Sequence, residues 1–274
     1  MRVRFVCPLV FAAALALMLL LPAPIARADS PDDTAGVSPE LIQEAQRKAS
    51  LQNLLYVNPD VDHARQGEAI DLGQVSVGAL VERGTLTLTR DTQAAFAYVQ
   101  PYREPDDYAH RNYCGAGAVT ELLSHWDPSL PQTIDIDQLG DEMGLDPNGG
   151  LWVKDMVPTI NNHLNQYLGQ TVDWYHYDKA TSLADFRYML DIDIRQNGVP
   201  LITGVMTGGL PGWGSSNVGH IIAVYGYTRS PDGTEYVEYC DTAAPSAGYA
   251  GMILNQLDLA SFWQAAGPEC AVDW

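Results

Sequence analysis

Apolar positions in the middle of the chain recur every three or four residues, which is the period of an amphipathic helix. This pattern predicts helices over residues 114–126, 151–166 and 182–196. Pro128 ends the first of them, because the residue before a proline avoids the helical region, and Gly198 ends the third. The middle of the chain is therefore predicted to be helical.

The pattern changes after Pro200 to short runs that are rich in β-branched and aromatic residues. Residues 201–206, 219–227 and 235–240 form such runs and predict three strands. The sequence Ser-Pro-Asp-Gly at 230–233 is a turn signal that joins the last two strands into a hairpin. Helices followed by an antiparallel sheet predict an α+β fold.

The first 28 residues have the three parts of a secretory signal peptide. A basic start, an apolar run over residues 5–21 and a small-residue cleavage site at 26–28 follow one another. A membrane anchor is the alternative, but the apolar run is short for a span and a cleavage site follows it. The protein is therefore predicted to be secreted to the extracellular space, with no stable membrane anchor after cleavage.

Residues 29–94 are predicted to form an N-terminal region that is either accessory to the main domain or prosegment-like. It begins with a polar, acidic stretch, which is followed by a helix over 38–55 and a short strand over 85–89. The remaining residues, 95–274, contain the other predicted helices and the sheet. They are predicted to form the main domain.

The chain is strongly acidic, with a formal net charge of −19. Cleavage after Ala28 removes Arg2, Arg4 and Arg27 and no acidic residue, so the formal charge changes from −19 to −22. Such a surface argues against nucleic acid or an anionic membrane as a partner. It weakly favours basic substrates, although a solvated acidic surface is the simpler explanation in a secreted protein.

Three cysteines remain once the signal peptide, with its Cys7, is removed: Cys114, Cys240 and Cys270. An odd number of cysteines in an oxidising compartment is most simply explained by one disulfide and one free thiol. We predict a disulfide between Cys240 and Cys270, which leaves Cys114 as the free thiol. A different pairing, or no disulfide, is the alternative.

Cys114 stands at the first turn of the helix predicted over 114–126, just after a polar and aromatic loop. The unpaired N–H groups and the dipole at a helix start favour the thiolate of such a cysteine, which is its nucleophilic form. This nucleophile needs a histidine as its base and a group that orients the histidine. Five of the six histidines, at positions 63, 110, 125, 163 and 176, are better explained as ordinary surface or core residues, and His110 has no obvious orienting group.

His220 is different because it stands at the start of one strand of the predicted hairpin, and Asp241 follows the other strand. With Pro231 and Asp232 at the centre of the turn, the two residues lie one diagonal step apart on the same face, with Cβ atoms about 7–8 Å apart. A slightly different turn would place them directly opposite each other. Cys114, His220 and Asp241 are therefore predicted to act as nucleophile, base and orienting group.

The order of these three residues, with helices before a sheet, resembles the papain-like cysteine peptidases. Within them the chain is most similar to the bacterial, bacteriocin-processing (double-glycine) peptidase family and its secreted relatives. That family has a Tyr-Cys-Gly-Pro-Ala start to its nucleophile helix, a Gly-His before an apolar strand ending in Gly-Tyr, and a strand ending in Asp-Pro. The matching residues, within residues 95–265, are Tyr113, Cys114, Gly115, Gly219, His220, Gly226, Tyr227 and Asp241. The resemblance implies a papain-like fold in which the nucleophile helix packs on an antiparallel β-sheet, and it implies no metal or organic cofactor.

The chain departs from this family pattern near the nucleophile and after the aspartate. Ala116 and Gly117 stand in place of Pro-Ala after the cysteine and glycine, and Thr242 stands in place of the proline that follows the aspartate. Neither change removes a catalytic atom. The family's oxyanion glutamine lies several residues before the cysteine, where this chain has no glutamine. We predict Gln100, or the closer amide of Asn112, in that role, with Gln100 slightly ahead.

Four residues beside the predicted site are expected to line a substrate cleft: Tyr113, Gly115, Trp213 and Gly219. Trp213 belongs to the glycine-rich loop 208–214, for which a flexible surface turn is the alternative. That loop is not a dinucleotide fingerprint, since no strand–loop–helix context surrounds it.

The predicted function is that of a secreted cysteine peptidase, which hydrolyses a peptide or protein through a thioester on Cys114. No metal is expected, since Leu139 breaks the calcium-loop pattern that Asp135 and Asp137 begin. Two alternatives use the same domain. They are another amide or acyl-transfer reaction by the same three residues, and a papain-like binding module without turnover. The substrate's sequence and the oligomeric state are left open.

Overall fold

The computed structural model describes residues 36–39, 93–169 and 171–273. The predicted signal peptide, the strand predicted over 85–89 and nearly all of the helix predicted over 38–55 lie outside these residues. The division at residue 95 and the role of the region before it therefore stay predictions.

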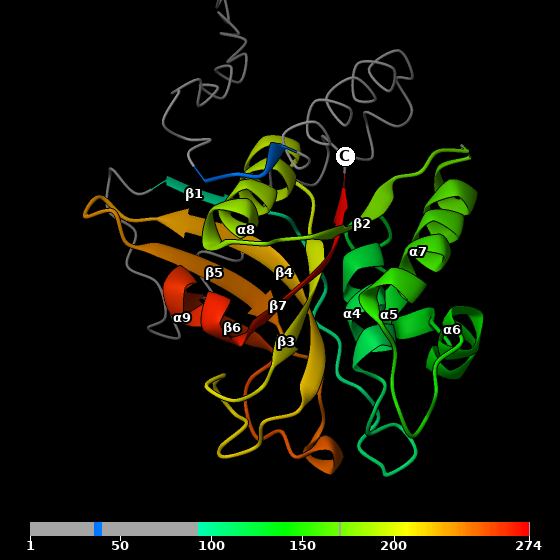
Figure 1. Cartoon of the computed structure of the whole chain (residues 1–274). Helices are drawn as coiled ribbons and strands as arrows, with labels where there is room; N and C mark the ends of the chain where they lie inside the picture. Colours follow the sequence, from blue (N-terminus) through cyan, green and yellow to red (C-terminus); the bar gives the residue numbers. More distant parts are fainter. Residues whose placement is uncertain (1–35, 40–92, 170, 274) are drawn as a thin grey trace, which may run out of the picture. The chain divides into compact units, whose positions relative to one another are not determined.

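A seven-stranded antiparallel sheet forms the centre of the described structure (Figure 1). Six strands follow the spatial order β2-β7-β3-β4-β5-β6, and β1 pairs with the far end of β4. The strands are β1 (Gln93–Phe96), β2 (Tyr175–Lys179), β3 (Leu201–Met206), β4 (Gly219–Arg229), β5 (Glu235–Cys240), β6 (Leu254–Asp258) and β7 (Ala266–Asp273).

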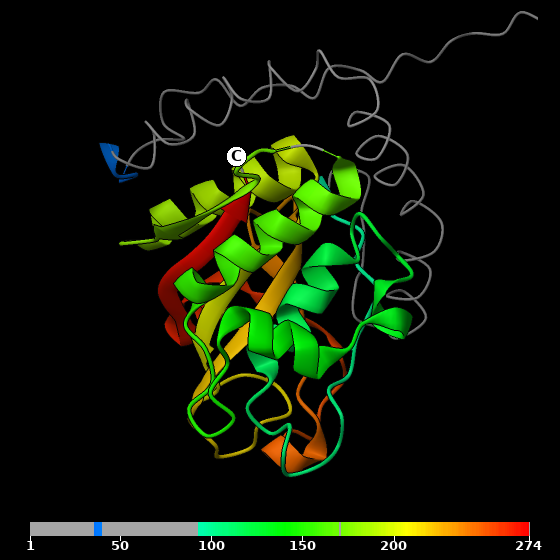
Figure 2. The ribbon, with the colours of Figure 1, turned by 90° about the vertical axis from the view of Figure 1, so that its right-hand side faces the viewer.

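Helices cover both faces of this sheet, as Figures 1 and 2 show. One face carries α4 (Cys114–Leu123), α5 (Leu130–Thr133), α6 (Ile136–Met143) and α7 (Val153–Leu168). The other face carries α8 (Leu183–Leu190), the π-helix Asp191–Asn197 and α9 (Leu259–Ala265). None of the helices in the described residues is long and apolar enough to span a membrane.

Strand β4 shows why both faces of the sheet need cover. Ile221, Ala223 and Tyr225 belong to the core shared with α4 and α7, whereas Ile222 and Val224 belong to the core shared with α8 and α9. Successive side chains of a strand point to opposite faces, so a strand that is buried on both faces must be apolar at successive positions. This is why the strand forms a continuous apolar run in the sequence and does not alternate.

The predicted α+β architecture is confirmed, with the helix that begins at Cys114 packed on an antiparallel sheet. The three predicted strands are β3, β4 and β5. The third predicted helix is divided into α8, which Ser182 caps by accepting the N–H of Asp185, and a π-helix that ends at Gly198 with a φ of 70°. The sequence did not predict β1, β6, β7, α5, α6 or α9.

The predicted disulfide between Cys240 and Cys270 is wrong. Cys240 ends β5 and Cys270 lies in β7, and two other strands separate these in the sheet. Neighbouring strands are about 4.8 Å apart, which separates the two residues by roughly 14 Å, whereas a disulfide joins Cα atoms within about 7 Å. None of the cysteines in the described residues forms a disulfide. The odd number of cysteines led to a wrong prediction because a cysteine need not form a disulfide. A buried cysteine also serves as a small apolar core residue.

Candidate active site

Cys114 is the first residue of α4, and it is partly exposed. Tyr113 precedes it as the N-cap residue, and no side chain caps the first turn of the helix. The N–H groups of that turn therefore favour negative charge near the Cys114 sulfur. Tyr113 itself is buried, and its hydroxyl donates to Asp137 of α6 at 2.9 Å. It therefore anchors the start of the helix. Contrary to the prediction, it does not line the cleft.

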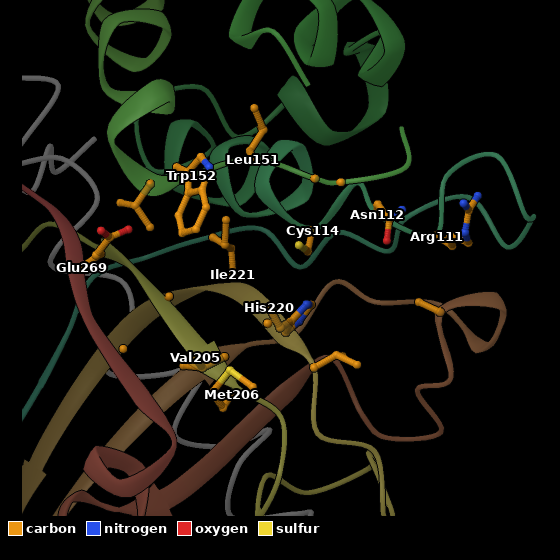
Figure 3. A pocket seen from close by; sticks show the side chains of 18 of the residues that line it. Arg111, Asn112, Cys114, Leu151, Trp152, Val205, Met206, His220, Ile221 and Glu269 are labelled. Atoms are coloured by element: carbon orange, nitrogen blue, oxygen red, sulfur yellow. The ribbon is translucent and has the colours of Figure 1, made fainter. Parts of the chain in front are cut away.

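His220 and Asp241 meet at the edge where β4 begins and β5 has just ended. Nε2 of His220 lies 2.9 Å from Oδ1 of Asp241, and both side chains are almost fully buried. The imidazole also hydrogen-bonds Cys114, which leaves Nδ1 as the nitrogen that faces the sulfur. Figure 3 shows Cys114 and His220 side by side, one from each layer of the molecule.

The charges around His220 favour its protonated form. Burial by itself lowers the pKa of this imidazole, but the negative charges of Cys114 and Asp241 and its hydrogen bonds to both outweigh burial. The pKa of His220 is therefore raised well above its usual value of 6.5. His220 therefore lies between the Cys114 sulfur on one side and the Asp241 carboxylate on the other, in surroundings that favour its protonated form.

Trp213 holds the histidine and the aspartate in place from behind. Its indole N–H donates to Oδ2 of Asp241 at 2.8 Å, and its ring packs edge-on against His220 with centroids 4.8 Å apart. The Ala243 backbone N–H adds a third donor to the carboxylate at 3.2 Å. Trp213 is buried, so the glycine-rich loop 208–214 is pinned at this residue and is not simply a flexible surface turn.

Two glycines of α4 allow the layers to approach each other closely at the site. A Cβ on Gly115 would lie 2.7 Å from Cε of Met156, and one on Gly117 would lie 2.5 Å from Oγ1 of Thr242. Contacts this short are not tolerated between well-packed atoms. Gly115 is thus a packing residue beneath the site and not the cleft residue that was predicted. Gly117 lets the residue after Asp241 lie against the nucleophile helix.

Residues 102–104 form a strap that ties α4 to the chain just after Asp241. The Tyr102 N–H donates to Oε1 of Glu121 on α4 at 3.1 Å. The Glu104 N–H donates to the Thr242 carbonyl at 3.0 Å, and the Thr242 hydroxyl donates back to the Glu104 carboxylate. The strap therefore joins the helix that carries the nucleophile to the segment that carries the carboxylate.

The strap encloses a buried carboxyl cluster, which we define as Glu104, Glu121 and the adjacent thiol of Cys240. Burial raises the pKa of Glu121 well above its usual value, and the charge of nearby Asp241 raises it further. Burial likewise raises the pKa of Glu104 and that of Cys240. Sequence reasoning missed this cluster, although Glu121 stands among the apolar residues of the helix predicted over 114–126.

A cleft of about 600 Å³ opens in front of Cys114 and His220 (Figure 3). Gly219 and Trp213 line it, as predicted for a substrate cleft. Gln100 does not, because its backbone N–H donates to Ser124 at the opposite end of α4. At a rise of 1.5 Å per residue, that end lies about 15 Å from Cys114. The structure therefore does not bring Gln100 to the site.

Asn112 is the oxyanion candidate that the structure places at the cleft. It lies beside Cys114 in Figure 3, and its Nδ2 donates to the Pro147 carbonyl at 2.7 Å. A side-chain amide has two N–H groups, so one remains to serve a bound substrate. The hydrogen bond to Pro147 also fixes the orientation of this amide.

The aspartates near α6 have structural partners. Asp135 caps the helix by accepting the N–H groups of Asp137 and Gln138. Asp137 in turn lies 3.2 Å from Nε2 of His110, whose Nδ1 is 2.8 Å from Asp107. His110 therefore has two orienting carboxylates where the sequence showed none. Within the described residues, no group of three or more histidine, cysteine or acidic side chains is arranged to hold a metal ion.

A family model described as "Peptidase_C39 like family" matches residues 93–271. No curated protein sequence matches the chain.

A double glycine motif protease from an AMS/PCAT transporter, in complex with the leader peptide, is 12% identical and covers 68% of this chain and 94% of its own, with a TM-score of 0.39. The bromelain protease from Ananas comosus, in complex with the E64 inhibitor, is 12% identical and covers 66% of this chain and 98% of its own, with a TM-score of 0.43. The digestive procathepsin L 3 of Tenebrio molitor larval midgut is 12% identical and covers 86% of this chain and 99% of its own, with a TM-score of 0.43.

Proposed function

The chain belongs to the Peptidase_C39-like family, and we propose that it is a secreted cysteine peptidase that cleaves peptide bonds with Cys114, His220 and Asp241. The observation that carries this proposal is the buried 2.9 Å hydrogen bond between His220 and Asp241, next to a cysteine that opens on the cleft. A thiol, an imidazole and a carboxylate in this order are a nucleophile, a base and a group that orients the base.

In the proposed reaction, the Cys114 thiolate attacks the carbonyl carbon of the substrate and forms a C–S bond. The raised pKa of His220 supports an imidazolium, which donates its proton to the leaving amine as the C–N bond breaks. Water then attacks the resulting thioester, and His220 accepts a proton from it. The C–S bond breaks, the carboxylate product leaves, and the thiolate–imidazolium pair is restored. Asp241 holds the imidazole in the required tautomer throughout.

The negative oxygen of each tetrahedral intermediate needs hydrogen-bond donors. The backbone N–H of Cys114, at the uncapped start of α4, is one such donor. The second N–H of Asn112 is the side-chain donor that we propose, because Asn112 lines the cleft next to the nucleophile. One donor of this kind contributes roughly 3–4 kcal/mol to transition-state stabilisation.

The test of the proposed activity is cleavage of a peptide library by the purified full chain beside its Cys114→Ala variant. We expect cleavage by the wild-type protein and none by the variant. Cys270→Ser is the matched control, since Cys270 is buried in the core that the sheet shares with α8 and α9 and does not line the cleft. Cleavage that persists in Cys114→Ala would exclude Cys114 as the nucleophile.

Labelling by iodoacetamide separates an inactive binding module from an enzyme. Cys240 and Cys270 are buried, so we expect only Cys114, of the described cysteines, to react in the folded protein. Rapid labelling at neutral or mildly acidic pH would support a thiolate at Cys114, and an unreactive Cys114 would contradict the proposed mechanism.

The N-terminal sequence supports the proposed secretion, and it is tested separately. The expected result is that the protein recovered from the medium of expressing cells begins at Asp29, as shown by N-terminal sequencing. Retention of the whole chain in the cells would contradict both the signal peptide and its cleavage site.

A further inference from the structure

The cleft has two chemically different halves on either side of Cys114. Arg111 and Asn112 line the half that lies toward the loop before α4, and that half is polar (Figure 3). The other half runs toward Glu269 in β7 and is walled by apolar side chains. The inference concerns this second half, and it rests on the proposed peptidase function.

Exposed apolar side chains gather around the cleft. Of the six large apolar residues that are exposed in the described part of the chain, three line it: Trp152 (65% exposed), Met206 (45%) and Val218 (49%). Single exposed apolar residues need no explanation, but several that border one cavity mark a binding surface. In Figure 3, Trp152 stands above the apolar half and Met206 below it.

A pair of glycines leaves this half hollow at its far end. Gly204 of β3 and Gly267 of β7 both line the cleft, at the place where the pairing of these strands shifts register. A Cβ on Gly267 would lie 3.1 Å from the Gly204 carbonyl oxygen, so the strands are close and carry no side chain there. The hollow that results is bordered by Val205 on one side and by Glu269 on the other.

Glu269 supplies a negative charge at the end of this otherwise apolar space. Its Oε1 accepts the Tyr177 hydroxyl at 2.6 Å and lies 3.4 Å from the Lys179 ammonium. Both contacts are to Oε1, so Oε2 is in a position to accept a donor from a ligand. The Lys179 side chain is 56% exposed, and an ion pair with such an exposed partner is weak.

We propose that this half of the cleft binds an arginine side chain of the peptide substrate. The aliphatic stem lies between Trp152 and Met206, and the guanidinium reaches the Glu269 carboxylate. A guanidinium suits this place because it binds carboxylates through a planar fork and stacks on aromatic rings such as that of Trp152. The formal charge, −19 for the whole chain and −22 after the proposed cleavage removes three arginines, adds a long-range attraction for a cationic peptide.

The test uses octapeptide libraries in which one position at a time is fixed as arginine, citrulline or norleucine. Citrulline has the shape of arginine without its charge. We expect one position at which wild-type kcat/KM is about tenfold higher for arginine than for citrulline, as a hydrogen-bonded charge pair at a partly exposed site would give. Glu269→Gln should bring the arginine-to-citrulline ratio at this position close to one. Glu142→Gln, on the surface of α6, is the control and should keep it.

A ratio near one at every position, or a ratio that survives in Glu269→Gln, would overturn the inference. If the wild-type protein cleaves none of the peptides, the proposed peptidase function fails. The proposed arginine site is then tested by peptide binding alone. The same peptides are then titrated against the Cys114→Ala variant by fluorescence polarisation. Tighter binding of arginine peptides that Glu269→Gln abolishes would support the inference, and equal binding of arginine and citrulline peptides would contradict it.

Discussion

The candidate active site and the buried carboxyl cluster each contain a buried titratable side chain, but their surroundings favour opposite charge states. In the active site, His220 is buried between Cys114 and Asp241, and the negative charges of these two residues raise its pKa in spite of burial. In the cluster, Glu121 is equally buried, but Asp241 and Glu104 are its neighbours, and like charges raise the pKa of a carboxyl further. The first arrangement favours a charged histidine, whereas the second favours a neutral acid.

The two cysteines at these places differ for the same reason. Cys114 is partly exposed at the start of α4 and faces a histidine. Cys240 is buried next to Glu121, and burial raises the pKa of its thiol well above the usual value. The charges and the burial around each thiol, and not the number of cysteines, therefore distinguish the cysteine that we propose as the nucleophile from a buried core cysteine.

Asp241→Asn is expected to have the largest effect, because it removes the charge that orients and stabilises the imidazolium. We expect kcat/KM to fall about 10³-fold or more. Asp241 also helps to raise the pKa of His220, so the alkaline limb of the pH profile should move to lower pH in the variant. Peptide cleavage measured from pH 5 to pH 10 checks both effects.

The exposed Asp155→Asn substitution on α7 is the control for Asp241→Asn, and we expect it to leave both the rate and the profile unchanged. An alkaline limb that stays in place in Asp241→Asn would mean that Asp241 does not govern the protonation of His220.

Gly117→Ala tests the close approach of α4 to the segment after Asp241. The added Cβ would overlap the Thr242 side chain, so the free energy of unfolding should fall by about 1–3 kcal/mol. Gly140→Ala in α6 is the matched control. Its nearest contact would be an ordinary 3.4 Å, and alanine favours a helix by about 0.5–1 kcal/mol over glycine. Urea unfolding of both variants measures the difference, and equal stabilities would refute the packing argument.

Trp213→Phe keeps an aromatic ring beside His220 but removes the N–H that Asp241 accepts. A hydrogen bond to a charged group contributes about 1.5–3 kcal/mol, and Asp241 retains its other donors, so we expect a loss of about tenfold in kcat/KM at the low end of that range. The lost N–H acts on the reaction through Asp241, so the loss should fall mainly on kcat, although the Trp213 ring also lines the cleft. A change confined to KM would instead indicate a role in the cleft wall.

The sequence predicted well those features that depend on neighbouring residues. The α4 period, the three strands and the hairpin that brings Asp241 to His220 all follow from local patterns and one turn. At the end of the hairpin near the site, Ala223 pairs with Cys240 as the predicted turn requires, whereas a register shift after Val224 changes the pairing nearer the turn.

Features that depend on distant pairing could not be predicted. β7 lies between β2 and β3, and no local signal shows that residues 266–273 form a strand inside the sheet. Gln100 was placed near Cys114 by its position in the sequence, but its segment runs beside the opposite end of α4. Glu104 and Glu121 reach one site only because the strap closes over the helix. The cluster therefore depends on tertiary contacts that the sequence pattern does not show.

Glu121→Gln is expected to have the smallest effect, and it tests directly whether the buried carboxyl cluster favours a neutral acid. The pKa of Glu121 is raised in the folded protein, so the folded state holds this proton to higher pH than the unfolded chain does. The corresponding stability is complete below the usual value of 4.5 and is lost as the pH rises through the folded pKa. Glutamine keeps the oxygen that accepts the Tyr102 N–H and never ionises. The variant should therefore match the wild type near pH 4 and exceed it on the order of 1 kcal/mol at pH 8.

Glu142→Gln should show the opposite sign, which is what makes the pair decisive. The hydrogen bond from His163 lowers the pKa of Glu142, so its contribution to stability is present above the usual value of 4.5 and is lost as the pH falls through the folded pKa. The site is exposed, and the loss at neutral pH should be no more than about 0.5 kcal/mol. Urea unfolding at pH 4, 6 and 8 measures both variants. If Glu121→Gln, like Glu142→Gln, became less stable than the wild type as the pH rose, Glu121 would be ionised in the folded protein. The buried carboxyl cluster would then not favour a neutral acid, and it would not differ from the active site in this respect.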